Sequence, residues 1–171
     1  MKKYEFTGET KEIRLLFRTA TLHRIRATVA FGIVEVGDLG GWIEKEENLS
    51  HEGKAWVWGN AEVWGNAKVC GDAEVWGNAE VCGDAEVFSA SHVLVIGAIG
   101  SRNDFTTFYR DKDNEITVKC GCFLGKIDRF LEKVTQTHGD SKYALVYRAA
   151  VEVAKLQIDL SGEAPKDADE E

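Results

Sequence analysis

The stretch VWGNAEVWGNAKVCGDAEVWGNAEVCGDAEV, residues 57–87, repeats one six-residue unit and decides the fold. Each unit opens with Val, continues with Gly-Asn or Gly-Asp two places later, and then has Ala followed by Glu or Lys. Neighbouring residues of a strand point to opposite sides, so Val and Ala are predicted to face inward and Glu, Trp and Cys outward. The Gly-Asn and Gly-Asp pairs tolerate positive φ and are predicted to turn the chain.

The same frame extends beyond this stretch on both sides. Its first position holds Val57, Val63, Val69, Val75, Val81, Val87, Val93 and Ile99. Its fifth position holds Ile43, Leu49, Ala55, Ala61, Ala67, Ala73, Ala79, Ala85, Ser91 and Gly97. Three such strands would close one triangular coil of eighteen residues. The sequence therefore predicts a mainly β fold in which residues 43–100 form a parallel β-helix of about three coils.

Folding the frame at eighteen residues concentrates outward-facing tryptophans on one side. That face is predicted to carry Trp56, Trp58, Glu74, Trp76, His92 and Leu94, with Trp58, Trp76 and Leu94 stacked in successive coils. Trp64 and Phe88 are assigned to the other two faces. A large outward apolar column seldom stays in water. It is expected to be covered by the C-terminal module or by a second copy, to dock another protein, or to form a small-ligand groove.

The segments on either side of the repeat complete the predicted domain organisation. Residues 1–42 contain short alternating runs and predict an N-terminal β cap that covers the first coil. Residues 101–160 contain two alternating runs around DKDN, then two helical patterns, and predict a ββαα module. That module is too small to bury much surface alone and is expected to pack on the β-helix, for example on the tryptophan face. Residues 161–171 predict a disordered acidic tail.

Composition narrows the class of partner. The net charge is −8, and residues 161–171 contribute five acids and one lysine to it. Phosphate binding needs a basic stripe, so duplex DNA is not expected as a partner, whereas a basic, nucleic-acid-handling protein would be attracted. No signal peptide or long apolar run is present, which predicts a cytoplasmic protein with no membrane association and with reduced cysteines.

Two longer stretches carry a family resemblance. LHRIRATVAFGIVEVGDLGGWIEKEENLSHEGKAWVWGNAEV, residues 22–63, resembles the N-terminal segment of hexapeptide-repeat proteins of bacteria and phages, some of which are described as acyltransferases. VKCGCFLGKIDRFLEKVTQTHGD, residues 118–140, is similar to a small module found in phage and gut-bacterial proteins of unknown role. The resemblance implies a left-handed β-helix and a phage or mobile-element origin. It implies no established activity, because fold does not fix function.

The residue types leave two kinds of chemistry open, acyl transfer and metal binding. If the chain were an acyltransferase using acyl-CoA, His92 would be the general base and Glu74, one coil below, would orient it. A metal would have Cys120, Cys122 and His138 as weak candidate ligands, although structural zinc normally takes four ligands. Neither set is complete, so no cofactor and no catalytic residue are expected.

The sequence thus favours a non-catalytic protein that binds another protein. Its candidate contact residues are Trp56, Trp58, Trp76, Leu94, Trp64 and Phe88. The resemblance makes an inhibitor of a bacterial defence effector, such as a CRISPR–Cas nuclease, a specific form of that function, acting in the host cytoplasm as an anti-CRISPR-like protein. A hexapeptide-repeat acyltransferase and a self-assembling structural element stay as alternatives, and a dimer or trimer is plausible.

Overall fold

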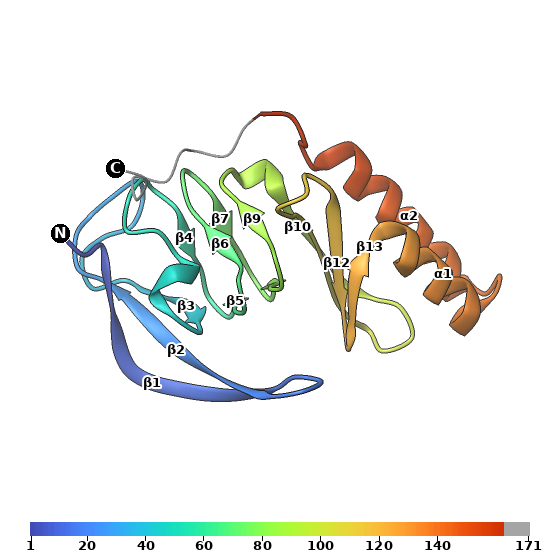
Figure 1. The fold of residues 1–171 in the computed structure, drawn as a ribbon, viewed down its shortest axis with the longest axis horizontal. Coiled ribbons are helices and arrows are strands. Elements are labelled where there is room, and N and C mark those ends of the chain that lie inside the picture. Colours follow the sequence, from blue (N-terminus) through green and yellow to red (C-terminus); the bar gives the residue numbers. More distant parts are fainter. Residues whose placement is uncertain (163–171) are drawn as a thin grey trace.

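The computed structural model describes residues 1–162, so most of the predicted acidic tail lies outside the described part of the chain. A long β-hairpin begins at the N-terminal end and runs along one side of the short repeat strands, and a sheet with two helices lies at the other end (Figure 1). The described strands form four separate sheets with mixed and antiparallel pairing. The prediction that the fold is one left-handed parallel β-helix is therefore wrong.

The repeat itself forms six strands of two residues each. They are β4 (Trp56–Val57), β5 (Glu62–Val63), β6 (Lys68–Val69), β7 (Glu74–Val75), β8 (Glu80–Val81) and β9 (Glu86–Val87). Each pairs in parallel with the strand eighteen residues away, as Val57 does with Val75 and Val63 with Val81. The frame valines and alanines from Ala55 to Val87 are at most 1% exposed and form most of the first core cluster. Alternation therefore predicted the inward residues correctly.

Glycine corners explain where the repeating path stops. Gly59, Gly65, Gly71, Gly77 and Gly83 all have φ between 55° and 69°, a region that other residues rarely adopt. At the next corner the glycine is replaced by Ser89, which has φ −145° and begins a 3₁₀ turn at Ala90–His92. The chain then enters β10 (Val93–Ile99), which pairs antiparallel with the following strand. The predicted extension of the parallel frame to residue 100 is wrong for this reason.

The N-terminal hairpin lies along the repeat and joins its sheet. Strands β1 (Tyr4–Arg14) and β2 (Thr19–Ala27) pair antiparallel, β2 pairs antiparallel with β3 (Leu39–Ile43), and β3 pairs in parallel with β5. The turn lies at residues 15–18, where the Leu15 N–H donates to the Arg18 carbonyl at 2.8 Å. β1 continues through Gly8–Thr10 without a turn, although Gly-Glu-Thr is a turn-like sequence. A register shift absorbs the irregularity there.

The C-terminal region is a four-stranded antiparallel sheet followed by two helices. Strand β10 leads to β11 (Asp104–Arg110), β12 (Ile116–Cys120) and β13 (Phe123–Lys126), paired in chain order. The predicted hairpin around DKDN is confirmed by the pairing of β11 with β12. The predicted ββαα module is wrong in its strand count, because β10 and β13 also belong to this sheet. Because β13 pairs with β12, the first helix, α1, begins only after this strand and spans Ile127–His138.

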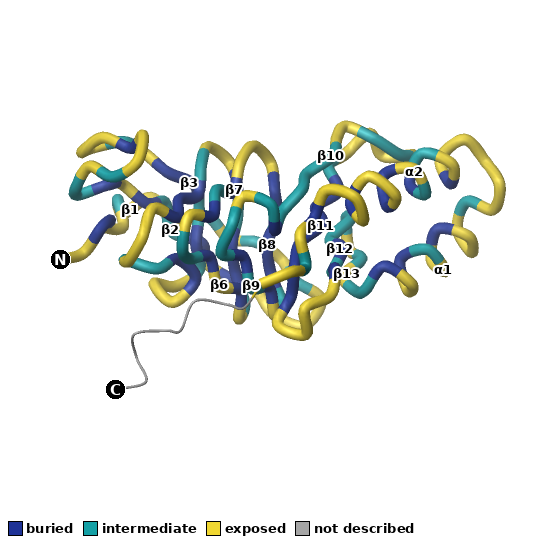
Figure 2. The backbone as a smooth tube through the Cα atoms, turned by 90° about the horizontal axis from the view of Figure 1, so that it is seen from above, coloured by how far each residue is buried: buried dark blue, intermediate teal, exposed yellow. Residues whose placement is uncertain are grey.

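Helix α2 (Lys142–Gln157) follows α1 after a short turn. Figure 2 shows buried and exposed positions alternating along both helices, as expected for helices with one packed side. Their buried residues form the second core cluster with the sheet, around Phe108, Phe130 and Val151. The helices therefore pack on their own sheet and not on the tryptophans of the repeat.

One tyrosine joins the two core regions. Tyr109 on β11 is fully buried in the first core cluster, and its hydroxyl donates to the Cys82 carbonyl at 2.9 Å. Beside it, the Glu80 N–H donates to the Thr107 hydroxyl at 3.0 Å. The C-terminal sheet thereby covers the last repeat strands and satisfies backbone groups that would otherwise face solvent.

Candidate functional site

Two stacked tryptophans stand on the surface of the repeat. Trp58 and Trp76 follow β4 and β7 at equivalent positions of the frame, and their rings stack with centroids 4.5 Å apart and planes 6° apart. This confirms the predicted contact between them. Trp76 Nε1 donates to Glu74 Oε2 at 3.0 Å, and Trp76 is 46% exposed. A ring fixed by a stack and a hydrogen bond therefore faces solvent.

Trp56 and Trp64 lie inside the molecule. Trp56 is fully buried against Tyr4 and Phe31 of the N-terminal segment. Trp64 is 5% exposed and packs with Leu22 and Cys82 beneath the hairpin. The N-terminal segment, which the sequence did not predict as their cover, removes both tryptophans from the surface that a partner of this chain could contact.

Leu94 and Phe88 are also separated from the stacked pair. Leu94 lies in β10, pairs with Phe108 and packs against the second core cluster, so it does not extend the predicted column above Trp76. Phe88 is half-buried beneath the Arg110 guanidinium, whose carbon lies 4.7 Å from the ring centroid. The predicted contact set thus leaves Trp58 and Trp76 as one surface feature.

The candidate acyl-transfer pair is not assembled. His92 is 2% exposed, and its Nδ1 accepts the Phe88 N–H at 3.3 Å. Burial, together with the positive charge of Arg110, lowers the pKa of His92. Glu74, its predicted partner, instead accepts from Trp76. Acyl transfer by these two residues therefore has no geometric support.

The three weak metal candidates lie around one cavity. Cys120 ends β12, Cys122 lies in the β12–β13 turn, and His138 ends α1. Among the described residues, no group of three or more His, Cys, Asp or Glu side chains could hold a metal ion. None of the four cysteines, all of which lie in the described part of the chain, is in a disulfide bond. Burial raises the pKa of Cys82 to about 11, which makes that thiol a poor nucleophile.

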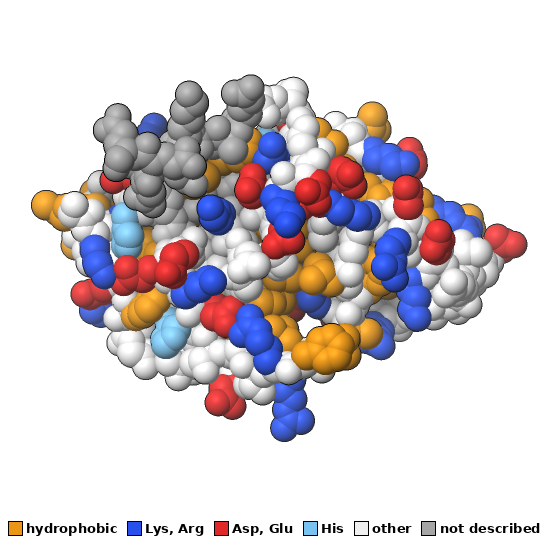
Figure 3. Space-filling model, viewed as in Figure 1, with side chains coloured by type: hydrophobic (Ala, Val, Ile, Leu, Met, Phe, Trp, Pro, Cys, Tyr) orange, Lys and Arg blue, Asp and Glu red, His pale blue; other side chains and the backbone are white. Residues whose placement is uncertain are grey.

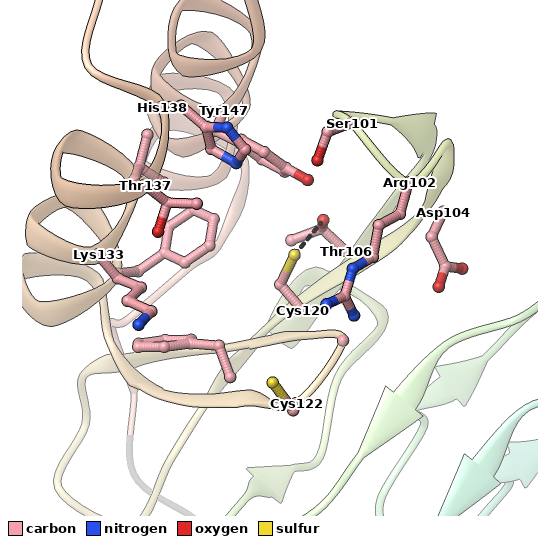
Figure 4. A pocket seen from close by; sticks show the side chains of 14 residues that line it. Ser101, Arg102, Asp104, Thr106, Cys120, Cys122, Lys133, Thr137, His138 and Tyr147 are labelled. Carbon is pink, nitrogen blue, oxygen red and sulfur yellow. Dashed lines mark hydrogen bonds between the residues drawn. The ribbon is translucent and has the colours of Figure 1, made fainter.

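The cavity itself has a volume of about 210 Å³ and is bounded by the β10–β11 loop, the β12–β13 turn and both helices (Figure 4). Its apolar wall consists of Phe123, Phe130 and Tyr147, with Phe130 centroids 5.4 Å from Phe123 and 5.7 Å from Tyr147. The His138 ring stacks on Tyr147 at 5.7 Å. An apolar hollow with a few polar groups at its rim is the usual form of a small-molecule site.

Polar and charged groups enter this cavity from opposite sides. Arg102 reaches in from the β10–β11 loop and Lys133 from α1, while the Thr106 hydroxyl donates to Cys120 Sγ at 3.4 Å (Figure 4). Burial and the neighbouring Cys120 raise the pKa of Tyr147 to about 12, so its hydroxyl stays protonated. Sequence reasoning missed this site, because Arg102, Lys133 and Tyr147 are far apart in the chain and carry no motif.

On the face drawn in Figure 3, basic and acidic side chains are interspersed, so that face presents no continuous basic stripe. None of the helices in the described part of the chain has both the length and the apolar character needed to cross a membrane. No family model matches the chain, and no curated protein matches it. The resemblance to hexapeptide-repeat proteins therefore stays a prediction.

Proposed function

We propose that the chain is a non-catalytic protein-binding protein that captures a basic segment of its partner through Trp76. The observation that carries the proposal is the exposed Trp76 ring stacked on Trp58. The proposal places the chain in the cytoplasm of a bacterial cell. An inhibitor of a nucleic-acid-handling defence effector is its most specific form, because such effectors carry basic surfaces for phosphate.

A rigid exposed tryptophan suits a contact residue for two reasons. Tryptophan is enriched among the residues whose truncation weakens protein complexes most. The stack on Trp58 and the hydrogen bond to Glu74 already fix the Trp76 side chain in the free chain. Little conformational entropy is then lost on binding, which favours affinity.

The surroundings of Trp76 favour a cation. A guanidinium or ammonium group over an indole face is attracted by the ring quadrupole. The carboxylate of Glu74 stands beside the ring, and no ion pair to Glu74 is present among the described residues. The net charge of −8 adds a long-range attraction for a basic partner. An arginine that contacts the ring and the carboxylate together would satisfy both groups.

The test compares three baits on the same resin: the wild-type chain, Trp76→Ala and Leu156→Ala. Leu156 is 89% exposed at the end of α2 and serves as the matched control for losing an exposed apolar side chain. The baits are incubated with a lysate of the cells in which the chain is encoded. We expect one protein of the lysate to be retained by the wild-type and Leu156→Ala baits and not by the Trp76→Ala bait. The purified partner should then bind Trp76→Ala about thirtyfold more weakly, the effect of losing about 2 kcal/mol.

A charge variant completes the design. Glu74→Gln keeps the size of the side chain and should weaken binding several-fold, with the difference shrinking at high salt. A partner that binds Trp76→Ala as tightly as the wild-type chain contradicts the proposal, as does the absence of any protein that distinguishes the baits. Light scattering on the same samples must show equal masses for the wild-type and Trp76→Ala chains. A dimer or trimer that dissociates in Trp76→Ala would mean that another copy of the chain covers this ring.

A further inference from the structure

We infer that the cavity between the β12–β13 turn and the two helices binds a small organic carboxylate with a flat apolar body. The inference is independent of the proposed protein binding, because the cavity lies in the C-terminal region and contains none of the repeat tryptophans. Its volume of about 210 Å³ is smaller than the roughly 300–1,000 Å³ of sites for drug-sized ligands. The ligand must therefore be small, on the scale of one aromatic ring with its acid group.

The apolar body would lie against aromatic rings that are already fixed. Phe130 is 3% exposed and touches both Phe123 and Tyr147 in edge-on or tilted geometry. The Tyr147 hydroxyl packs closely over Gly100, where a Cβ would come 1.8 Å from it. Rings held in this way offer a preformed surface for a flat ligand, to which aromatic contacts add beyond simple burial.

The acid group would lie between two cations that face the same space. Neither Arg102 nor Lys133 forms an ion pair with any carboxylate of the described chain, and both line the cavity. Arg102 rests on the turn, so that a Cβ at Gly121 would stand 3.0 Å from its Nη1. The remaining charged residue of the lining, Asp104, binds the Phe105 N–H at 2.7 Å and lies on the far side of Arg102 from Cys120 (Figure 4).

This donor set distinguishes carboxylates from neutral ligands. Arginine offers a planar fork that matches a carboxylate, and lysine adds a second positive charge from the facing helix. The Thr106 hydroxyl is already committed to Cys120, so the two cations are the strongest donors left for an anion. A neutral molecule of the same shape would keep the aromatic contacts and lose the ionic ones.

Alkylation of Cys120 measures the electrostatic field that Arg102 and Lys133 create in the cavity. The Cys120 thiolate attacks the methylene carbon of iodoacetate or iodoacetamide, a C–S bond forms, iodide leaves, and the thiol proton goes to solvent. The two reagents need the same thiolate, so the ratio of their rates cancels the ionisation of Cys120 and reports the field acting on the reagent carboxylate. The measurement uses the full chain with Cys122→Ser, since Cys122 is exposed in the adjoining turn, and mass spectrometry follows Cys120.

We expect the iodoacetate-to-iodoacetamide rate ratio at Cys120 to be about fivefold higher in the folded chain than in the urea-unfolded chain, from a partly screened positive field. In Arg102→Gln/Lys133→Gln the ratio should fall to that of the unfolded chain. The matched control is Arg129→Gln/Lys142→Gln, which removes the same charge from two cations outside the cavity that also lack an ion pair among the described residues. This control should keep the ratio high.

Ligand binding is then measured with benzoate against benzamide, its neutral counterpart. Benzoate should slow alkylation of Cys120 by iodoacetamide and shift the amide NMR signals of Cys120 and Gly121, and benzamide at the same concentration should do neither. The benzoate effects should disappear in Arg102→Gln/Lys133→Gln. Equal effects of the two probes, no effect of benzoate on either readout, or an equal fall of the rate ratio in the control variant would overturn the inference.

Discussion

The repeat strands and the C-terminal sheet bury their residues by different means. In residues 55–87 the core is built from equivalent valines and alanines, each packed on its counterpart eighteen residues away. In residues 93–157 the core is built from unlike side chains that meet once, such as Phe108, Phe130 and Tyr147. Stability in the repeat is therefore spread over many copies of one contact, whereas in the sheet it depends on individual residues.

Two spectroscopic signals report on the two regions separately. All five tryptophans, Trp42 to Trp76, precede β8, and both helices follow β13. Tryptophan fluorescence therefore reports on the repeat and its N-terminal sheet, while helical circular dichroism reports on the C-terminal region. Variants can be scored for each region separately in one urea titration.

The largest effect is expected from Tyr109→Ala, because this side chain joins the two regions. Removing a fully buried aromatic ring costs about 3–5 kcal/mol, and we expect both probes to shift together to lower urea. Tyr109→Phe is the control. It keeps the ring and loses the hydrogen bonds of the hydroxyl with the Cys82 carbonyl and Cys82 Sγ, so it should cost about 1 kcal/mol. A helical signal that shifts while fluorescence stays at its wild-type midpoint would show that the two regions unfold independently.

A smaller effect is expected from the repeat corners, where two glycines with the same backbone differ in their surroundings. Gly71 and Gly77 have φ of 61° and 64°, but an added Cβ would lie 2.6 Å from the Phe88 carbonyl oxygen at Gly71 and would meet nothing within 4 Å at Gly77. Gly77→Ala should cost only the left-handed conformation, about 1 kcal/mol. Gly71→Ala adds a backbone clash and should cost about 2–4 kcal/mol. Equal losses by fluorescence-detected unfolding would mean that neighbouring strands yield easily.

The same contrast explains what the sequence could reveal. The hexad frame predicted the buried valines and alanines, the glycine corners and the stacking of Trp58 on Trp76, because each signal recurs several times. It did not predict that Ser89 would end the parallel pairing, since the frame letters Val93 and Ile99 continue for two more units. Replacement of one corner glycine outweighed two further matches to the pattern.

The surfaces depended on contacts between distant segments, which a pattern within one segment does not encode. The burial of Trp56 requires Tyr4 and Phe31, and the exposure of Trp76 depends on the C-terminal sheet packing elsewhere. The cavity combines Arg102, Cys120 and Lys133 from three elements. The sequence identified Cys120 and His138 as notable but gave them a metal role, because their aromatic and cationic neighbours become visible only in the folded chain.

The last prediction concerns Asp111, a single polar residue that organises the β11–β12 turn. Burial alone would raise its pKa, but hydrogen bonds from Lys126, Thr117 and two backbone N–H groups outweigh burial and hold the pKa below its usual range. A carboxylate with a lowered folded pKa stabilises the fold above its unfolded pKa of about 3.8 and loses that contribution as pH falls through the folded value. Asp111→Asn should therefore cost about 1.5–3 kcal/mol at pH 7 by helix-detected unfolding, with the difference from wild type shrinking below about pH 4.

The control is Asp113→Asn, because Asp113 is an exposed neighbour that contacts the same lysine at 3.1 Å. This variant should stay within about 0.5 kcal/mol of wild type at both pH values. A loss at Asp111 that is unchanged at pH 2.5 would show that the side chain acts through its shape and not through its charge.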